Sequence, residues 1–231
     1  GFDSPRIDYA DTQSITTGLA EVLKATGGTL DALFNNGAHG LPGAVEDLAT
    51  VGLREIFETN VFGWHELTRQ VLPIMRAQGH GRIVQNSSIL GLVSFPWRGA
   101  YVATKYAIEG LTDTLRVELF DTDIKVALIE PGPVTSKFRE NAIPHFERYI
   151  DWQNSPFRPL YEKKLLKRLY ESSGPDQFEL PASAVTAKLI HACEAPRPRA
   201  RYYVTTPTHI AGFLRRILTT RAIDRILSRL R

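Results

Sequence analysis

Apolar residues follow two alternating patterns along this chain. Short apolar runs that end at polar residues predict strands buried on both faces. These predicted strands cover residues 5–9, 30–35, 81–88, 125–130 and 201–205. Longer stretches with apolar residues three and four positions apart predict amphipathic helices. The predicted helices cover residues 11–25, 51–77, 100–120, 160–170, 182–193 and 208–231.

Strands that alternate with helices indicate an α/β fold, in which a doubly wound parallel sheet lies between two helix layers. In such sheets, ligands bind beyond the carboxyl ends of the strands. Several polar residues stand at or just after these ends: Asp8, Asn35, Ser88 and Thr135. We therefore expect a ligand site at this edge of the sheet.

Tyr101 and Lys105 lie four positions apart in a predicted helix. This spacing puts both side chains on one helix face, about 5–6 Å apart at Cβ. An ammonium beside a phenol lowers the pKa of the phenol, so Tyr101 is expected to give or take a proton near neutrality. Asn60 lies on the apolar stripe of the helix over 51–77, so its amide should have a definite hydrogen-bonding partner.

Length and composition fit one domain over residues 1–231, with 43% hydrophobic residues to form its core. Residues 136–180 follow a strand end and are aromatic, charged and proline-dotted, which is typical of a substrate loop. The single cysteine, Cys193, excludes an internal disulfide, and we expect a reducing, cytoplasmic location. No apolar run reaches the ~20 residues of a membrane span. We assign no metal ligands.

The C-terminal segment, residues 208–231, is basic and amphipathic. From Arg197 onward the chain has nine arginines and one acid, Asp224. The pattern fits a helix packed on protein, which we favour, and also a helix lying on an anionic membrane surface. Nucleic acid is not an expected partner, because no recognition motif accompanies the arginines.

Five short features occur in a fixed order along the chain. They are residues 35–38 (NNGA), Asn60, Ser88, the Tyr101/Lys105 pair and residues 131–135 (PGPVT). In this order and spacing they resemble the short-chain dehydrogenase/reductase family, over essentially the whole chain. Within it, residues 129–134 (IEPGPV) and the basic C-terminus look most like bacterial aldehyde reductases related to retinol and 17β-hydroxysteroid dehydrogenases. The resemblance implies a Rossmann-type fold.

The resemblance also implies roles for individual residues. Tyr101 would protonate a carbonyl oxygen, or take the proton back in the oxidative direction. Lys105 would assist Tyr101 and hold the nicotinamide ribose. Ser88 would hydrogen-bond the substrate oxygen, and Asn60 would hold a water that links Lys105 to solvent.

For the cofactor, the resemblance implies NAD(P), with NADP(H) placed ahead of NAD(H). Asp8 would meet the adenine, Asn35 the adenine-side ribose, and Gly37 would lie beside the cofactor. The nicotinamide amide would be held by residues of the last motif: Pro131, Val134 and Thr135. Apolar residues would line the substrate side, which favours a small hydrophobic aldehyde, ketone or alcohol: Phe95, Trp97 and Phe138. The family also implies a homo-oligomer, assembled through the long helices that carry Asn60 and Tyr101.

Two departures from the family pattern affect these expectations. The family usually reads Asn-Asn-Ala-Gly where residues 35–38 read NNGA, an exchange that can alter the backbone beside the cofactor and that we expect to be tolerated. The family's first two strands and its glycine-rich phosphate loop are not found, so we expect the natural chain to extend upstream. The alternative is a non-catalytic binding or scaffold protein on a truncated oxidoreductase fold.

Overall fold

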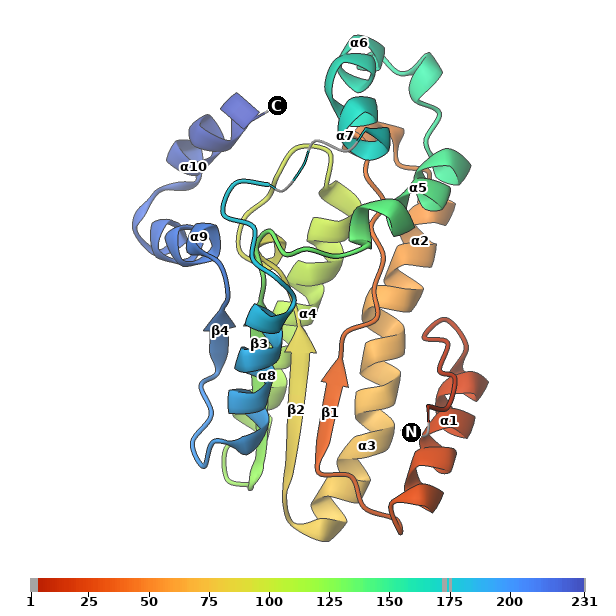
Figure 1. Cartoon of the computed structure of the whole chain (residues 1–231), viewed down its shortest axis with the longest axis vertical. Coiled ribbons are helices and arrows are strands. Elements are labelled where there is room, and N and C mark those ends of the chain that lie inside the picture. The colour runs from red at the N-terminus through yellow and green to blue at the C-terminus, as the bar shows by residue number, and fades with distance from the viewer. Residues whose placement is uncertain (1–3, 172–173, 175, 231) are drawn as a thin grey trace.

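The computed structural model describes residues 4–171, 174 and 176–230. Within them, four parallel strands form one sheet in the order β1-β2-β3-β4 (Figure 1). The strands are β1 (Ala32–Asn35), β2 (Gly81–Asn86), β3 (Ile124–Glu130) and β4 (Arg201–Tyr203). All four point the same way, so their carboxyl ends share one edge, and the predicted α/β fold is confirmed.

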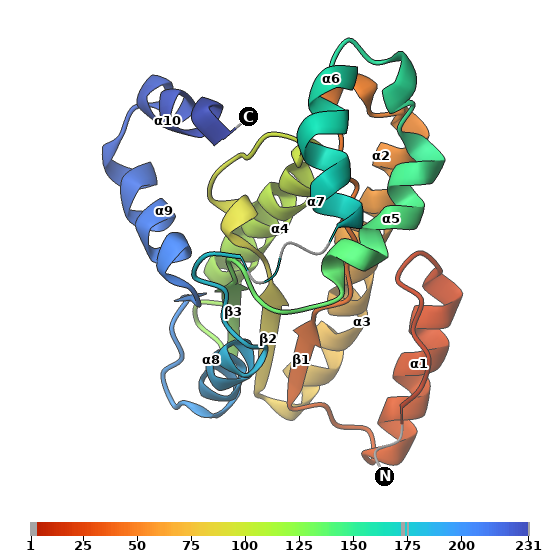
Figure 2. The same ribbon diagram turned by 45° about the horizontal axis from the view of Figure 1, so that its top comes forward.

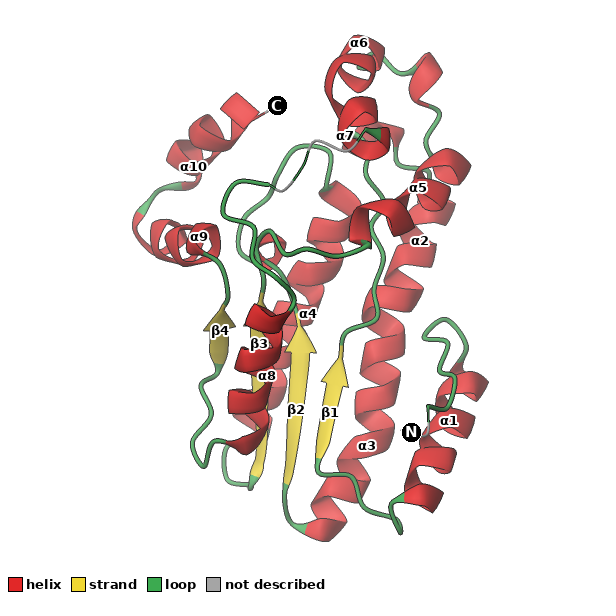
Figure 3. Ribbon diagram, viewed as in Figure 1, coloured by secondary structure: helices red, strands yellow, loops and turns green. Residues whose placement is uncertain are grey.

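Helices cover both faces of this sheet. The described α-helices are α1 (Thr12–Ala25), α2 (Thr50–Phe57), α3 (Gly63–Gln78), α4 (Gly99–Glu118), α5 (Phe138–Tyr149), α6 (Arg158–Leu160), α7 (Leu166–Tyr170), α8 (Ser183–Glu194), α9 (Thr206–Ile217) and α10 (Thr220–Leu227). Helix α8 packs on one face of the sheet, while α3 and α4 pack on the other (Figure 3). Helix α1 packs against α3, beyond the edge of the sheet. The three layers expected from the sequence are therefore present.

Alternating strand residues enter two separate cores. Ile83 and Leu128 face α3 and α4, where they are fully buried. Their neighbours Val84 and Ile129 face α8 and are buried as well. Because both faces are covered, both sets of side chains must be apolar, which explains the continuous apolar runs in the sequence.

The helix predicted over 51–77 contains a π-helical turn, η2 (Glu58–Phe62), between α2 and α3. A π turn inserts one extra residue and redirects the side chains within it. Asn60 lies in this turn and has no exposed surface. The helix ends at Gly79, whose φ of 81° supplies the left-handed cap that a residue with a Cβ adopts only at a cost.

The segment after β3 stands above the carboxyl ends of the strands (Figure 2). It contains α5, α6, α7 and a second π turn, η5 (Tyr161–Leu165). The predicted helix over 160–170 corresponds to α6, η5 and α7, whereas α5 was not predicted because Pro144 lies inside it. Within the segment 136–180, residues 172, 173 and 175 lie outside the described part.

Two predicted elements are wrong. Residues 5–9 form no strand: Ile7 lies against Gly18 of α1 and Tyr9 against Gly63 of α3, and the segment does not pair with the free edge of β1. Ile7 instead packs on the core near α1. The tail is two helices rather than one: Leu218 is extended, and the Thr219 side chain accepts a hydrogen bond from the Ala222 backbone N–H to start α10.

Four short 3-10 turns connect these elements in the described chain: η1 (Val45–Asp47), η3 (Ile89–Gly91), η4 (Trp152–Asn154) and η6 (Ser228–Leu230). Arg231, the last residue of the predicted tail helix, lies outside the described residues. Among those described, no helix is both long and apolar enough to cross a membrane.

Candidate active site

Ser88, Tyr101 and Lys105 come together where β2 ends and α4 begins. Ser88 follows β2 and caps η3, because its Oγ accepts a hydrogen bond from the Leu90 backbone N–H at 3.1 Å. Lys105 Nζ lies 5.3 Å from the centre of the Tyr101 ring. The loop is tied to the end of β3 by a 2.7 Å hydrogen bond from Ile89 N–H to Pro131 O.

Lys105 is 1% exposed, and its Nζ donates to the backbone oxygen of Asn86 at 2.8 Å. The Nζ also lies 4.3 Å from the centre of the Trp64 ring. Burial lowers the pKa of Lys105 to about 7, and the nearby Glu109 carboxylate only partly opposes this. An ammonium carries three N–H donors, so two are left without a partner among the described residues. Such unused, buried donors fit the diol of a nicotinamide ribose.

The Tyr101 phenol does not have the lowered pKa expected from its spacing to Lys105. Although Tyr101 keeps part of its surface exposed, desolvation raises its pKa above the usual value, and a hydrogen bond with Ser88 only partly opposes this. Lys105 is itself only partly charged near neutrality, so it offers the phenolate less positive charge than an exposed lysine. The phenol is therefore protonated at neutral pH in this structure.

Asn60 has the definite partners that the sequence predicts. Its Oδ1 accepts from the His39 backbone N–H at 3.1 Å, and its Nδ2 donates to His39 O at 2.9 Å. Nδ2 also lies 3.4 Å from Thr104 Oγ1, and the Thr104 hydroxyl donates to Tyr101 O at 2.8 Å. Asn60 thus joins the π turn to the loop after β1 and to the helix that carries Tyr101.

Asn35 is not available to a ribose in this structure. Its side chain is fully buried and donates to Gln85 Oε1 at 2.9 Å and to Thr68 Oγ1 at 3.1 Å. Asn36 is exposed, and its Oδ1 accepts from Asn86 Nδ2. Side chains of successive strand residues point to opposite faces of the sheet. From this alternation, the contact with the cofactor ribose could have been predicted for Asn36 rather than Asn35.

The exchange of Gly37 and Ala38 relative to the family pattern causes no backbone strain. Ala38 does not adopt a positive φ. At Gly37, an added Cβ would lie 2.7 Å from the Tyr9 ring, so the glycine allows this ring to approach. Its carbonyl accepts a 2.8 Å hydrogen bond from Trp64 Nε1. An alteration of the backbone is therefore not required.

Residues 131–135 form a short bridge with the segment before α8. Thr135 N–H donates to Leu180 O at 3.0 Å, and Val134 pairs with Leu180. The Thr135 hydroxyl donates to Glu179 Oε1 at 2.6 Å, so it is already engaged.

Asp8 is exposed and forms a turn rather than a strand end, with its Oδ1 accepting from the Ala10 backbone N–H at 3.0 Å. This turn lies beside the carboxyl end of β1, because Tyr9 Oη is 3.4 Å from Asn35 Oδ1.

The three predicted substrate-side residues separate in the structure. Phe138 meets Tyr101 edge to face, with ring centres 4.9 Å apart. Trp97 packs instead on Tyr161 and Phe157, at 5.1 and 5.8 Å between ring centres. Trp97 also has a φ of 65°, which a bulky residue rarely adopts and which often marks functional segments. Phe95 is partly buried in the loop before α4.

Known proteins are similar to this chain in sequence. The family model for short chain dehydrogenases matches residues 3–145. The uncharacterized oxidoreductase YbbO of Escherichia coli is 37% identical over 227 residues, which cover 98% of this chain and 78% of YbbO. Human retinol dehydrogenase 8 is 35% identical over 133 residues, covering 58% of this chain and 42% of that protein.

Solved structures extend the likeness to the fold. A short-chain dehydrogenase/reductase from Burkholderia phymatum, in complex with NAD, is 26% identical and has a TM-score of 0.73 over 96% of this chain and 75% of that one. A short chain dehydrogenase from Burkholderia cenocepacia, in complex with NADP, is 17% identical and shares the fold with a TM-score of 0.72, over 97% of this chain and 80% of its own. The Rossmann-type fold is thus confirmed, and the chain belongs to the short-chain dehydrogenase/reductase family of oxidoreductases.

Proposed function

We propose that this protein is an NAD(P)-dependent oxidoreductase that reduces a hydrophobic aldehyde or ketone to an alcohol, or catalyses the reverse reaction, with Tyr101 as proton donor and acceptor. One observation carries the proposal. The Tyr101 hydroxyl hydrogen-bonds with Ser88, and the buried Lys105 Nζ lies 5.3 Å from the centre of the Tyr101 ring, at the carboxyl edge of a parallel sheet.

The chain's own residues divide the work of carbonyl reduction. When bound, a nicotinamide cofactor supplies the hydride. Tyr101 donates its proton to the carbonyl oxygen, and Ser88 donates a hydrogen bond to the same oxygen as charge develops there. Because the pKa of Tyr101 is raised, the phenol is protonated at neutral pH, which is the form that reduction requires.

Cofactor binding follows from the groups that remain accessible at this edge. Lys105 offers two N–H donors to a ribose, and we add the exposed Asn36 in place of the buried Asn35. The other proposed contacts are retained from the sequence: Asp8, Gly37, Pro131, Val134 and Thr135. Asn60 is proposed to position a water between Lys105 and solvent. NADP(H) is placed ahead of NAD(H) on the resemblance to aldehyde reductases alone.

The substrate class is proposed from apolar residues near Tyr101. Phe138 presents its ring to the Tyr101 ring, and Phe95 and Trp97 belong to the loop that leads into α4. A carbonyl oxygen at Tyr101 would therefore enter beside the Phe138 ring, which favours an apolar substrate. The similarity to human retinol dehydrogenase 8 supports the same class.

The C-terminal helices are proposed to pack on protein rather than on a membrane. The Arg215 guanidinium stacks on the Tyr106 ring at 4.9 Å and donates to Leu92 O, which fixes α9 on the subunit. The opposite face leaves Ile210 and Phe213 exposed. Salt-sensitive sedimentation with anionic vesicles would contradict this assignment.

A titration and a substrate series test the proposed function. NADPH and NADH are titrated into the protein by fluorescence, and turnover is then measured with straight-chain aldehydes of increasing length. We expect saturable binding, with kcat/KM rising with chain length as more apolar surface is buried. Absence of both binding and turnover would favour the alternative of a non-catalytic scaffold.

A further inference from the structure

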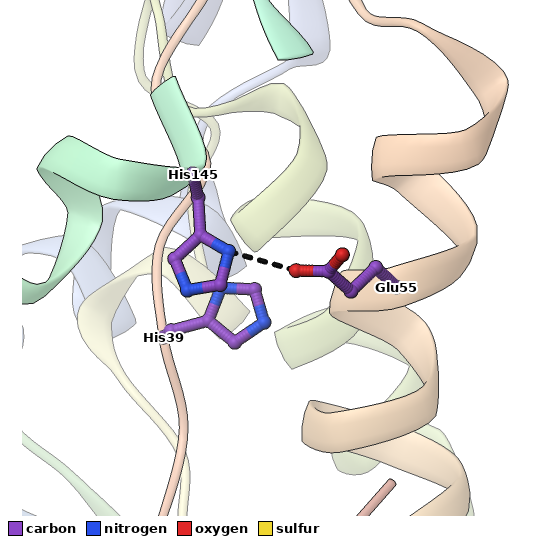
Figure 4. Close-up of side chains that lie close together, drawn as sticks. All are labelled: His39, Glu55 and His145. Carbon is purple, nitrogen blue, oxygen red and sulfur yellow. Dashed lines mark hydrogen bonds and ion pairs between the residues drawn. The ribbon is translucent and has the colours of Figure 1, made fainter. Parts of the chain in front are cut away.

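Three titratable side chains meet in a second cluster, formed by His39, Glu55 and His145 (Figure 4). His39 lies in the loop after β1, Glu55 in α2 and His145 in α5. Each offers one metal-ligating atom, and the three atoms lie within 4.8 Å of one another. None of these residues has a role in the proposed proton transfer. The cluster therefore needs a separate explanation.

The two imidazole rings stack nearly parallel, with centres 3.7 Å apart and planes 12° apart. His145 Nδ1 is 2.8 Å from Glu55 Oε1. Both ring nitrogens of His39 are buried and make no hydrogen bond of normal geometry within the described part of the chain, where the ring has only a weak interaction with the Gly40 backbone. A buried polar atom without a partner costs free energy, so His39 has an unused capacity to bind a ligand.

The cluster is only partly buried. The side chains of His145 and Glu55 remain 26% and 29% exposed, which leaves a route from solvent.

Neighbouring groups would hold the carboxylate in place. The Tyr149 hydroxyl donates to Glu55 Oε2, and Arg148 Nη1 lies 3.8 Å from the same oxygen. Hydrogen bonds of this kind orient metal-binding carboxylates and tune their affinity.

We propose that His39, Glu55 and His145 form a binding site for a divalent transition-metal ion of the Zn²⁺ class. Two imidazoles and one carboxylate are a common ligand set for such ions, with a fourth position left for water. In a tetrahedral site with bonds of ~2.1 Å, ligand atoms lie about 3.4 Å apart. His145 Nδ1 and Glu55 Oε1, now 2.8 Å apart, would have to separate, and the two stacked imidazoles would have to rotate so that both rings face the ion.

Such an ion would connect the segment above the sheet to the body of the protein. His39 is held through its backbone by Asn60, and α5 starts at Phe138, which contacts Tyr101. The ion would therefore fix α5 over the Ser88–Tyr101–Lys105 group. This is a structural role, which does not depend on the reaction proposed above.

Cobalt titration tests the site without an activity assay. Untagged, metal-free protein is titrated with Co²⁺ while visible absorption is recorded, and Zn²⁺ is then added as competitor. We expect one Co²⁺ per chain, displaced by Zn²⁺, and a rise in Tm with either ion. Removing a residue that only hydrogen-bonds to a metal ligand lowers metal affinity about 10–100-fold. Removing a ligand should cost more, so Glu55→Gln and His145→Ala should each lower the affinity for Co²⁺ by at least about 100-fold.

The matched control is His80→Ala. His80 Nε2 lies 3.0 Å from Asp31 Oδ1, so it is also a histidine–carboxylate pair, but it lies at the turn between α3 and β2. This variant should keep wild-type affinity. The proposal is overturned if wild type shows no saturable binding, or if Glu55→Gln, checked by circular dichroism to be folded, binds Co²⁺ as wild type does.

Discussion

At the scale of single residues, burial governs the chemistry of the site as much as spacing does. The sequence placed Tyr101 and Lys105 on one helix face, and the structure has them there. It did not predict that desolvation would raise the pKa of one and lower that of the other, because burial depends on Trp64 and other residues distant in the chain. The same limit applies to Asn35, whose burial arises from packing against α3.

Lys105 should make the stability of the cofactor-free protein depend on pH. Its pKa is about 7 when folded and ~10.4 in an unfolded chain. Between these values the unfolded state holds the proton and the folded state does not, so the free energy of unfolding rises with pH. Burying the charged lysine destabilises the folded state fully below pH 7. This destabilisation declines as the pH rises from 7 to about 10 and is absent above that range.

Urea unfolding of wild type and Lys105→Met between pH 7 and 10 checks this. As the pH rises, the free energy of unfolding of wild type should increase relative to that of Lys105→Met, by up to about 1.4 kcal/mol per pH unit. Parallel pH profiles for the two proteins would show that Lys105 keeps an ordinary pKa.

At the scale of elements, helices and strands with a regular apolar period were predicted, and irregular ones were not. The π turns η2 and η5 have no sequence period of their own, since each is a local insertion in a longer helix. The division of the tail depends on Thr219, whose capping hydrogen bond competes with a continuous helix. Residues 5–9 have a strand-like composition but pair with no strand in the described part of the chain.

Tyr161, in η5, should anchor the segment above the sheet. Its hydroxyl donates to Asp47 Oδ2 at 2.7 Å and accepts from the Ala44 backbone N–H at 2.8 Å. Tyr161→Phe leaves the Ala44 N–H without a partner, which should lower the free energy of unfolding by about 1–3 kcal/mol. Proteolytic cleavage within 136–180 should also become faster, as measured by limited proteolysis.

Tyr170→Phe is the control for this prediction. Tyr170 is exposed, and its hydroxyl donates to Glu147 at 2.9 Å on the surface. This variant should change stability and cleavage little. Equal effects of the two substitutions would mean that the Tyr161 hydroxyl does not hold the segment in place.

At the scale of the whole molecule, the sequence predicted the layered sheet and the edge that carries the site. The His39, Glu55 and His145 cluster was not predicted, because its members lie in three separate elements without a shared motif spacing. Exposed apolar side chains also became visible only in the structure. Leu111 and Val117 of α4 and Phe62 of η2 are largely exposed, on the helices expected to assemble the homo-oligomer.

Leu111→Asp should therefore weaken self-association. A charge on a buried apolar contact is strongly unfavourable, so the apparent mass should fall towards 25.9 kDa in light scattering at low micromolar protein. Phe213→Asp, on the exposed face of α9, serves as the control and should leave the mass unchanged. The opposite result would place the interface at the C-terminal helices.

The central claim is that Tyr101 delivers the proton, and the most direct measurement compares Tyr101→Phe with Tyr106→Phe. Both remove one hydroxyl from the same helix, and the Tyr106 hydroxyl donates to Leu92 O at 3.0 Å. The assay uses NADPH and the aldehyde with the highest kcat/KM in the substrate series. Because general acid catalysis contributes at least about 100-fold, kcat of Tyr101→Phe should fall by that factor, while its affinity for NADPH stays the same. Tyr106→Phe should turn over as wild type does. Turnover by Tyr101→Phe at the wild-type rate would contradict the account.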